Sequence, residues 1–391
     1  MKALITNKLN EIYEAIVDNY KREDHSLYAG NMGILLFLAN YSKFSKNQTI
    51  RNIFETKLDK TINAICEGIY RPSFCTGISG ILYGIILLNE NKFSALNISH
   101  IHQEYAPYLK KQMLLEMERG RFDFLHGGIG IANYLLKNGN LDDRKEILQL
   151  VDKLENIGIL EKNSIKWEFV NPISAQKTFN ISLSHGMSSI AIFLCKMIKL
   201  NIDVDRCTNL LTNTINYITQ QEIDHKKYGS YFPSSSIESE KYNLTKSRLA
   251  WCYGDLGVAQ ALLVSGHTLH NREWQDKAID ILKFSTTRRD LKRENVTDAG
   301  ICHGAAGIAH IFKRMYIETN NFQFKVTHDF WIEQTLKMAI FEDGLAGYKT
   351  WKGHNLGWSH ETSFLEGIAG IGLMLLSSIS DDPKYSKWDE M

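Results

Sequence analysis

The sequence predicts an all-α fold, an α/α toroid in which seven inner and seven outer helices close into one barrel. Two observations predict it. A Gly-x-x-Gly motif followed by an apolar run recurs along the 391 residues, and the segments between the copies are amphipathic. Successive copies lie 47 to 68 residues apart, enough for an inner helix, a turn and an outer helix. The first glycines of the copies are Gly30, Gly77, Gly127, Gly186, Gly254, Gly304 and Gly367.

Each motif opens a helix that is apolar on nearly all sides, as in TGISGILYGIILL from Thr76. Such a helix is expected to be buried. A glycine in the first turn allows another backbone or a ligand to approach closely. The fourth copy departs from the motif, because Ser189 replaces its second glycine. The seven copies therefore predict seven buried inner helices.

The segments between the copies predict the outer helices. An example is DDRKEILQLVDKLENIG from Asp142, whose charged face would meet solvent. A linear stack of helix pairs would need polar caps at both ends. The first and last copies are as apolar as the others, so we expect a closed ring and a single domain spanning residues 1–391.

Two longer intervals contain insertions. Residues 158–183 alternate as a β-strand does, and residues 222–247 are polar and aromatic with a run of serines. Both adjoin the candidate chemical residues described below. They are expected to be lids or substrate-binding loops, although plain surface loops would give the same pattern.

Composition excludes several classes of protein. The 45 Lys and Arg residues balance the 44 Asp and Glu residues, so there is no electrostatic footprint for nucleic acid. A hydrophobic content of 44% argues against intrinsic disorder. No stretch approaches 18 consecutive apolar residues, and the N-terminus lacks the apolar core of a signal peptide. We therefore expect no membrane anchor, a cytoplasmic location and reduced cysteines.

Two neighbouring turns carry the residue types of a zinc site. They read Trp-Cys-Tyr-Gly around Cys252 and Cys-His-Gly from Cys302. If the ring brings the turns together, Cys252, Cys302 and His303 supply three ligands and leave a fourth tetrahedral position open, as catalytic zinc requires. Cys75 has the same offset from its glycine but no histidine beside it, which favours a structural role.

The donor set indicates the chemistry. Zinc with two thiolates and a neutral imidazole carries no net charge, so it is a weak Lewis acid for hydrolysis. It is better suited to hold a third thiolate, because zinc lowers the pKa of a bound thiol. The implied reaction is attack by a substrate thiol on an electrophilic carbon.

Three other turn residues suit such a reaction. His185 is a candidate general acid or base, Asp123 could orient its ring, and Arg248 could stabilise an oxyanion. For His185 and Asp123, an ordinary structural hydrogen bond remains the competing interpretation. Weaker candidates are His126 beside Gly127, Glu366 as a brace of the last turn, and His354 and His360 as capping or pocket-lining residues.

These motifs resemble the lanthionine synthetase C family, the lantibiotic cyclases, over essentially the whole chain. The resemblance implies an α/α toroid with a central zinc ion on Cys252, Cys302 and His303, and roles in catalysis for His185, Asp123 and Arg248. Members act on ribosomally made precursor peptides dehydrated at Ser and Thr. They add Cys thiols to dehydroalanine or dehydrobutyrine and so form lanthionine or methyllanthionine rings.

The resemblance also implies partners, namely the dehydrated precursor peptide, a separate dehydratase, and a transporter as a further candidate. Three alternatives stay open on the residues alone. They are a zinc enzyme that adds glutathione or another small thiol, a non-catalytic toroid that binds peptides, and an α/α-barrel glycosidase. The last needs paired carboxylates, beside which two thiolates would have no role.

Overall fold

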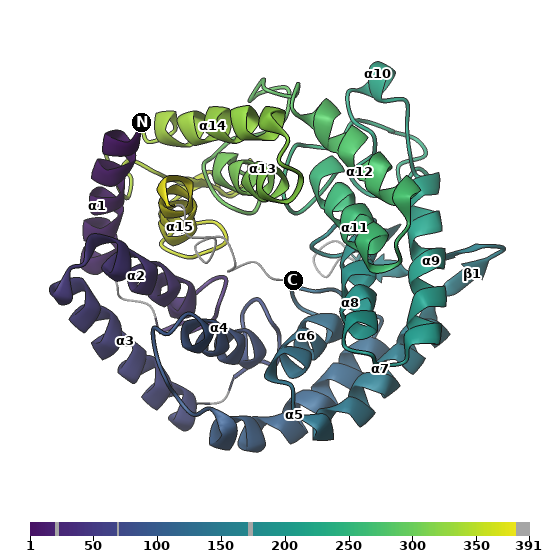
Figure 1. The fold of residues 1–391 in the computed structure, drawn as a ribbon, viewed down its shortest axis with the longest axis horizontal. Helices are drawn as coiled ribbons and strands as arrows, with labels where there is room; N and C mark the ends of the chain where they lie inside the picture. The colour runs from purple at the N-terminus through teal and green to yellow at the C-terminus, as the bar shows by residue number, and fades with distance from the viewer. Residues whose placement is uncertain (20–22, 69, 171–174, 381–391) are drawn as a thin grey trace. The chain divides into compact units, whose positions relative to one another are not determined.

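The computed structural model describes residues 1–19, 23–68, 70–170 and 175–380, and they are mostly helical (Figure 1). The chain divides into two compact units. Unit 1 holds Met1–Tyr105 and Val296–Glu390, and unit 2 holds Ala106–Asn295. Helix α5 (Ser99–Glu118) runs through the boundary. Within the described residues, every helix is too short or too polar to cross a bilayer.

Seven helices begin directly after the seven first glycines, as predicted, and the remaining long helices alternate with them along the chain. In unit 1 the glycine-turn helices are α2 (Asn31–Ser45), α4 (Ile78–Glu90), α13 (Ala305–Thr319) and α15 (Ile368–Ile379), beside α1 (Lys2–Asp18), α3 (Gln48–Glu67) and α14 (Phe322–Lys337). In unit 2 they are α6 (Gly128–Asn138), α8 (Met187–Lys199) and α11 (Asp255–Thr268), beside α7 (Arg144–Ile157), α9 (Val204–Gln220) and α12 (Arg272–Ser285).

The two kinds of helix form two layers within each unit (Figure 1). In the glycine-turn helices nearly every side chain is buried, whereas α7 buries only one face, with Ile147, Leu150, Val151 and Leu154. The second layer therefore shields the first from water. Asparagine side chains cap α3, α12 and α14 by accepting backbone N–H groups of the first turn.

The glycine turns share one main-chain arrangement. In six of them the N–H of the first helical residue donates to the carbonyl seven residues earlier, as from Met187 to Asn180 at 2.9 Å. A Cβ on Gly186 would lie 2.2 Å from that carbonyl oxygen, and one on Gly77 would lie equally close to Arg71 O. Glycine is therefore required at this position by the close approach of two main-chain segments.

The insertion at 158–183 contains strands, as predicted, and residues 171–174 of it lie outside the described residues. Strands β1 (Ile159–Glu161) and β2 (Ser164–Lys166) form one hairpin, and β3 (Glu168–Val170) and β4 (Lys177–Phe179) form another. The second insertion contains the short helix α10 (His225–Tyr228). Elements that the sequence analysis did not anticipate are the 3₁₀ turn η1 (Leu141–Asp143) and the hairpin of β5 (Thr350–Trp351) with β6 (Trp358–Ser359).

One buried histidine makes stability depend on pH. Burial lowers the pKa of His328 on α14 to about 4, although its hydrogen bond to Ala309 O opposes the shift. Below pH 6.5 the unfolded chain binds a proton here that the folded chain binds only near pH 4, so acidification favours unfolding. Between pH 6.5 and 4 we expect the free energy of unfolding of the wild type to fall by up to about 3 kcal/mol more than that of His328→Asn. Urea unfolding at both pH values measures this, and identical losses would contradict it.

Candidate active site

Within each unit, main-chain hydrogen bonds join several neighbouring turns through the residue two positions before the first glycine. In unit 1 the N–H of Cys302 donates to Leu365 O, that of Leu365 to Tyr28 O and that of Tyr28 to Cys75 O, at 2.9 to 3.2 Å. In unit 2 the N–H of Ser184 donates to Cys252 O at 3.3 Å. These main-chain bonds hold the turns in register, so residues with equal offsets from their glycines occupy equivalent places.

Within unit 2, His185 lies beside Asp123. His185 immediately precedes the glycine that caps α8, and its Nδ1 lies 3.1 Å from Asp123 Oδ1. The same carboxylate oxygen accepts the backbone N–H groups of Leu125 and His126. Asp123 is buried and the imidazole is partly exposed. The carboxylate therefore fixes the ring, leaves Nε2 free of it and selects the tautomer with hydrogen on Nδ1.

Three aromatic rings surround the imidazole of His185. The ring of His126 stacks on it at 6.0 Å, Phe169 of β3 lies at 5.6 Å and Tyr253 at 6.3 Å between centroids. Burial lowers the pKa of His126, the nearby His185 lowers it further, and Asp123 opposes the shift. The lowered pKa favours the neutral form of His126.

Arg248 and Cys252 lie on the turn before α11. The Arg248 guanidinium is partly exposed and donates to Asn295 O at 3.2 Å, and Cys252 is buried. This turn differs from the other six in its backbone. Gly254 has φ +84°, a conformation that favours glycine, whereas the other six capping glycines have negative φ.

A buried ion network braces that turn. Arg288 donates to Asp255 Oδ2 at 2.9 Å, to Glu294 Oε2 at 2.7 Å and to Ser247 O at 2.6 Å. Asp255, the first residue of α11, also accepts the N–H groups of Tyr231 and Phe232. Burial raises the pKa of the Asp255 carboxyl, although Arg288 and the two N–H groups oppose the shift. The network ties the second insertion to the turn that carries Cys252.

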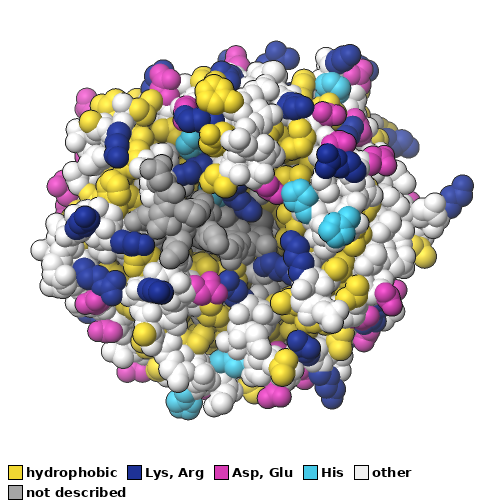
Figure 2. All heavy atoms as spheres, in the orientation of Figure 1, with side chains coloured by type: hydrophobic (Ala, Val, Ile, Leu, Met, Phe, Trp, Pro, Cys, Tyr) yellow, Lys and Arg dark blue, Asp and Glu magenta, His cyan; other side chains and the backbone are white. Residues whose placement is uncertain are grey.

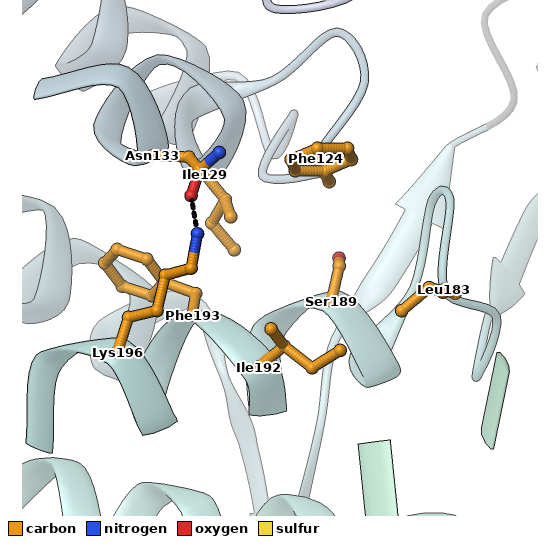
Figure 3. A pocket seen from close by; sticks show the side chains of 8 residues that line it. All are labelled: Phe124, Ile129, Asn133, Leu183, Ser189, Ile192, Phe193 and Lys196. Carbon is orange, nitrogen blue, oxygen red and sulfur yellow. Dashed lines mark hydrogen bonds between the residues drawn. The ribbon is translucent and has the colours of Figure 1, made fainter. Parts of the chain in front are cut away.

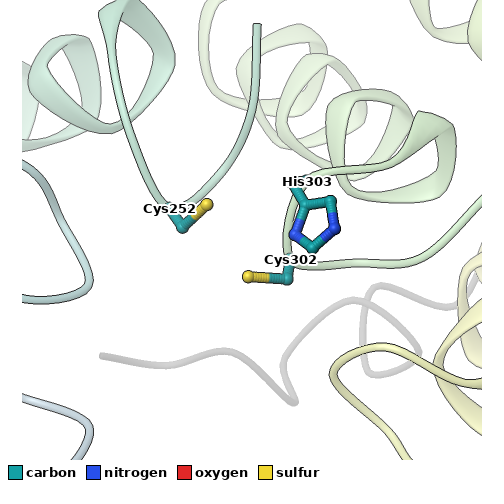
Figure 4. A group of neighbouring side chains, drawn as sticks. All are labelled: Cys252, Cys302 and His303. Atoms are coloured by element: carbon teal, nitrogen blue, oxygen red, sulfur yellow. The ribbon is translucent and has the colours of Figure 1, made fainter. Parts of the chain in front are cut away.

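Cys302 and His303 project from one turn of unit 1, before α13 (Figure 4). Both are partly exposed. Asp298 Oδ2 lies 3.8 Å from His303 Nε2 and accepts the N–H of Trp351, while Asp298 Oδ1 accepts the N–H of Gly300. A carboxylate behind a histidine ligand is a common way to orient such a ligand.

The weaker candidates have structural partners. Cys75 is buried among the turns of unit 1, where its carbonyl accepts from Tyr28. Glu366 pairs with Lys352, which agrees with a bracing role. His360 Nε2 lies 2.6 Å from Asp343 O, and the ring of His354 contacts Trp351 edge-on.

The two insertions contact each other beside His185. The Phe179 N–H donates to Ser239 Oγ at 2.8 Å, and the buried Lys166 pairs with Glu161 and with Glu238. A lid role for them stays a prediction.

A cavity of about 10 Å³ lies between α6 and α8, where Lys196 donates to Asn133 (Figure 3). It has room for about one water molecule and is too small for a peptide.

Sequence reasoning missed three contributors, namely Asp298, Phe169 and the Arg288–Asp255 pair. A signal existed for Asp298, since it lies six residues before its glycine, at the offset that Asn180 and Arg248 share. No local signal exists for the others, because their partners are distant in sequence.

Comparison with known proteins identifies a family and several relatives that this chain resembles. The family model "Lanthionine synthetase C-like protein" matches residues 21–391. Nisin biosynthesis protein NisC of Lactococcus lactis subsp. lactis is 26% identical over 406 residues, covering 95% of this chain and 89% of that protein. Glutathione S-transferase LANCL1 of Danio rerio is 26% identical over 284 residues, covering 69% of this chain and 63% of that protein.

The fold is matched by a solved structure. Nisin cyclase superposes with a TM-score of 0.76 at 21% identity, covering 99% of this chain and 96% of that one. The similarity confirms the predicted all-α fold class, the α/α toroid. Since the family model spans nearly the whole sequence, this chain belongs to the lanthionine synthetase C-like family.

Proposed function

We propose that this chain is a zinc-dependent peptide cyclase, which adds Cys thiols to dehydroalanine or dehydrobutyrine in a dehydrated precursor peptide and forms thioether rings. The observation that carries the proposal is the hydrogen bond between His185 and Asp123, because His185 lies on a turn whose main chain is bonded to that of Cys252. Family membership and the likeness to Nisin biosynthesis protein NisC support it.

Cys252, Cys302 and His303 are the proposed zinc ligands. Each offers one ligand atom, the sulfur of each cysteine and a ring nitrogen of the histidine. Two sulfurs and one imidazole nitrogen fit zinc, and they leave one tetrahedral position for a substrate. Zinc held there would lower the pKa of a substrate thiol, which would then be a thiolate at neutral pH.

The side chains of this chain would control the proton and the developing charge. The thiolate sulfur adds to the β-carbon, the C=C π bond breaks, and the α-carbon takes a proton, so the net change is addition of S–H. His185 Nε2 carries that proton, because Nδ1 is held by Asp123. Arg248 stabilises the enolate oxygen. Holding both reacting groups of one peptide lowers the entropic barrier.

Partners and organisation follow from the same proposal. A substrate that arrives dehydrated requires a separate dehydratase, and a transporter would export the product. We place the enzyme in the cytoplasm, where its zinc-binding cysteines stay reduced. The seven repeats, with α5 continuous through the unit boundary, support a single domain over residues 1–391.

A second candidate function is addition of glutathione to an electrophile. The similarity to Glutathione S-transferase LANCL1 favours it. Both functions use a thiolate and a proton donor, so the residues alone do not separate them. The substrate separates them, since a cyclase needs the thiol and the electrophile in one peptide.

The test uses a synthetic peptide with one dehydroalanine and one cysteine, incubated with the zinc-loaded protein at pH 6. Ring formation consumes the thiol without changing the mass, so mass spectrometry after N-ethylmaleimide treatment detects it. We expect His185→Asn to slow ring closure by about 10²- to 10⁴-fold with unchanged zinc content. The matched control is His100→Asn, at an exposed histidine of α5.

Two outcomes would contradict the proposal. If His185→Asn closes rings at the wild-type rate, the assignment of the proton donor is wrong. If the wild type joins free glutathione to the peptide but closes no ring, the second function replaces the first.

A further inference from the structure

A group of aromatic and aliphatic side chains reaches the surface of unit 1 around the hairpin β5–β6. The ring of Trp358 lies 4.8 Å from Phe341 and 5.2 Å from Trp351, between centroids, and Trp351 contacts His354. Leu356 lies in the loop of the same hairpin. We call these five residues the aromatic patch. Hydrophobic side chains also reach the surface near α13 and α14 in Figure 2.

The patch is partly exposed to solvent and is not packed within the core of unit 1. Trp358 is 39% exposed and Leu356 is 77% exposed. Clustered apolar side chains at a surface commonly mark a binding site, because the fold gains little from exposing them together. By contrast, Trp331 of the neighbouring helix α14 is fully buried. The exposed rings are therefore available to a ligand.

The hairpin is fixed to the turn that carries His303. The Trp351 N–H donates to Asp298 Oδ2, the carboxylate oxygen that also lies nearest to His303. On the adjacent residue, Thr350 Oγ1 donates to Glu366 O at 2.7 Å. The patch thus includes a residue whose N–H is bonded to the carboxylate beside a proposed zinc ligand, and it lies within reach of a peptide bound at that ligand.

The charges of the hairpin are already paired within unit 1. Lys349 pairs with Asp343, and Lys352 pairs with Glu361 and Glu366. The patch therefore offers apolar faces rather than unmatched charge. This favours an apolar side chain of a ligand over an acidic one.

We propose that the aromatic patch binds a large apolar side chain, aromatic or aliphatic, of the substrate peptide, at a fixed distance from the cysteine that is to react. The proposal rests on the proposed function. The patch would then determine which cysteine of the peptide reacts. A side chain bound on the rings determines which segment of the peptide reaches His303.

The test measures binding without turnover. Fluorescein-labelled twelve-residue peptides carry one cysteine, no dehydro residue and alanines, with a single Phe moved stepwise away from the cysteine. Fluorescence anisotropy with the full zinc-loaded chain gives each Kd. At one spacing we expect Phe to tighten binding about tenfold over the all-Ala peptide. Trp358→Ala should abolish that gain, and Trp358→Phe should restore most of it.

Controls separate this proposal from the proposed function. Phe322→Ala removes an exposed aromatic ring of α14 outside the patch and should keep the gain. A peptide in which serine replaces the cysteine shows how much the zinc-bound thiol alone contributes to binding. The gain from Phe is measured separately, so it can persist even if the cysteine contributes nothing. The proposal is overturned if no spacing gives a gain, if Trp358→Ala keeps it, or if Phe322→Ala removes it equally. Self-association of the chain that depends on Trp358 would also overturn it.

Discussion

Replacing Cys302 with alanine is expected to reduce bound zinc from about one ion per chain to near zero and to abolish ring closure. Cys302 and His303 are consecutive, so one turn supplies two of the three proposed ligands. Losing one thiolate leaves two protein ligands, which do not retain the ion against a weak chelator. Elemental analysis after dialysis measures the zinc, and the thiol-consumption assay measures the ring.

The matched control for Cys302→Ala is Cys75→Ala. Cys75 has the same offset from its glycine and belongs to the same series of main-chain bonds in unit 1. It should keep the full zinc content and activity. Circular dichroism must show that both variants are folded. A folded Cys302→Ala protein that still holds one zinc ion would refute the proposed ligand set.

Arg288→Met is expected to destabilise the protein by about 3 to 5 kcal/mol, because it leaves a buried carboxylate without its counter-ion. The side chains of Arg288 and Asp255 are 3% and 0% exposed, so water does not replace the lost partner. Glu294 is less affected, since Lys246 also pairs with it at 2.8 Å. Chemical unfolding followed by circular dichroism measures the change.

Two further variants test this account of the Arg288 network. Adding Asp255→Asn removes the unpaired charge and should recover part of the lost stability. Arg272→Met breaks a solvent-exposed pair with Asp276 and should change stability by less than about 1 kcal/mol. Equal losses for Arg288→Met and Arg272→Met would show that burial of the network is unimportant.

The helices were predictable because their signals are local. Each glycine turn and its apolar run lie within about a dozen residues, and the caps at Asn47 and Asn321 lie directly before their helices. The partnership of His185 with Asp123 was predictable for a different reason. Equivalent turns of a repeat point the same way, so side chains near the glycines were expected to gather at one end, although His185 lies one residue before its glycine and Asp123 four before.

The remaining features depend on the path of the chain. Asp255 and Arg288 are 33 residues apart, and nothing near either one identifies the other. Phe169 lies in an insertion that no other repeat contains, so the register could not place it beside His185. The hairpin β5–β6 was hidden because each of its strands has only two residues.

The main-chain bonds between neighbouring turns do not depend on the side chains that the turns carry. Cys302, Leu365, Tyr28 and Cys75 occupy successive links of one series, yet their side chains are of three kinds, a thiol, an aliphatic chain and a phenol. Because each link uses only an amide N–H and a carbonyl, exchanging a side chain leaves the link intact. Such a scaffold can evolve by changing one codon at a time at these positions, and a protein engineer could transplant a ligand from one turn to another without redesigning the backbone.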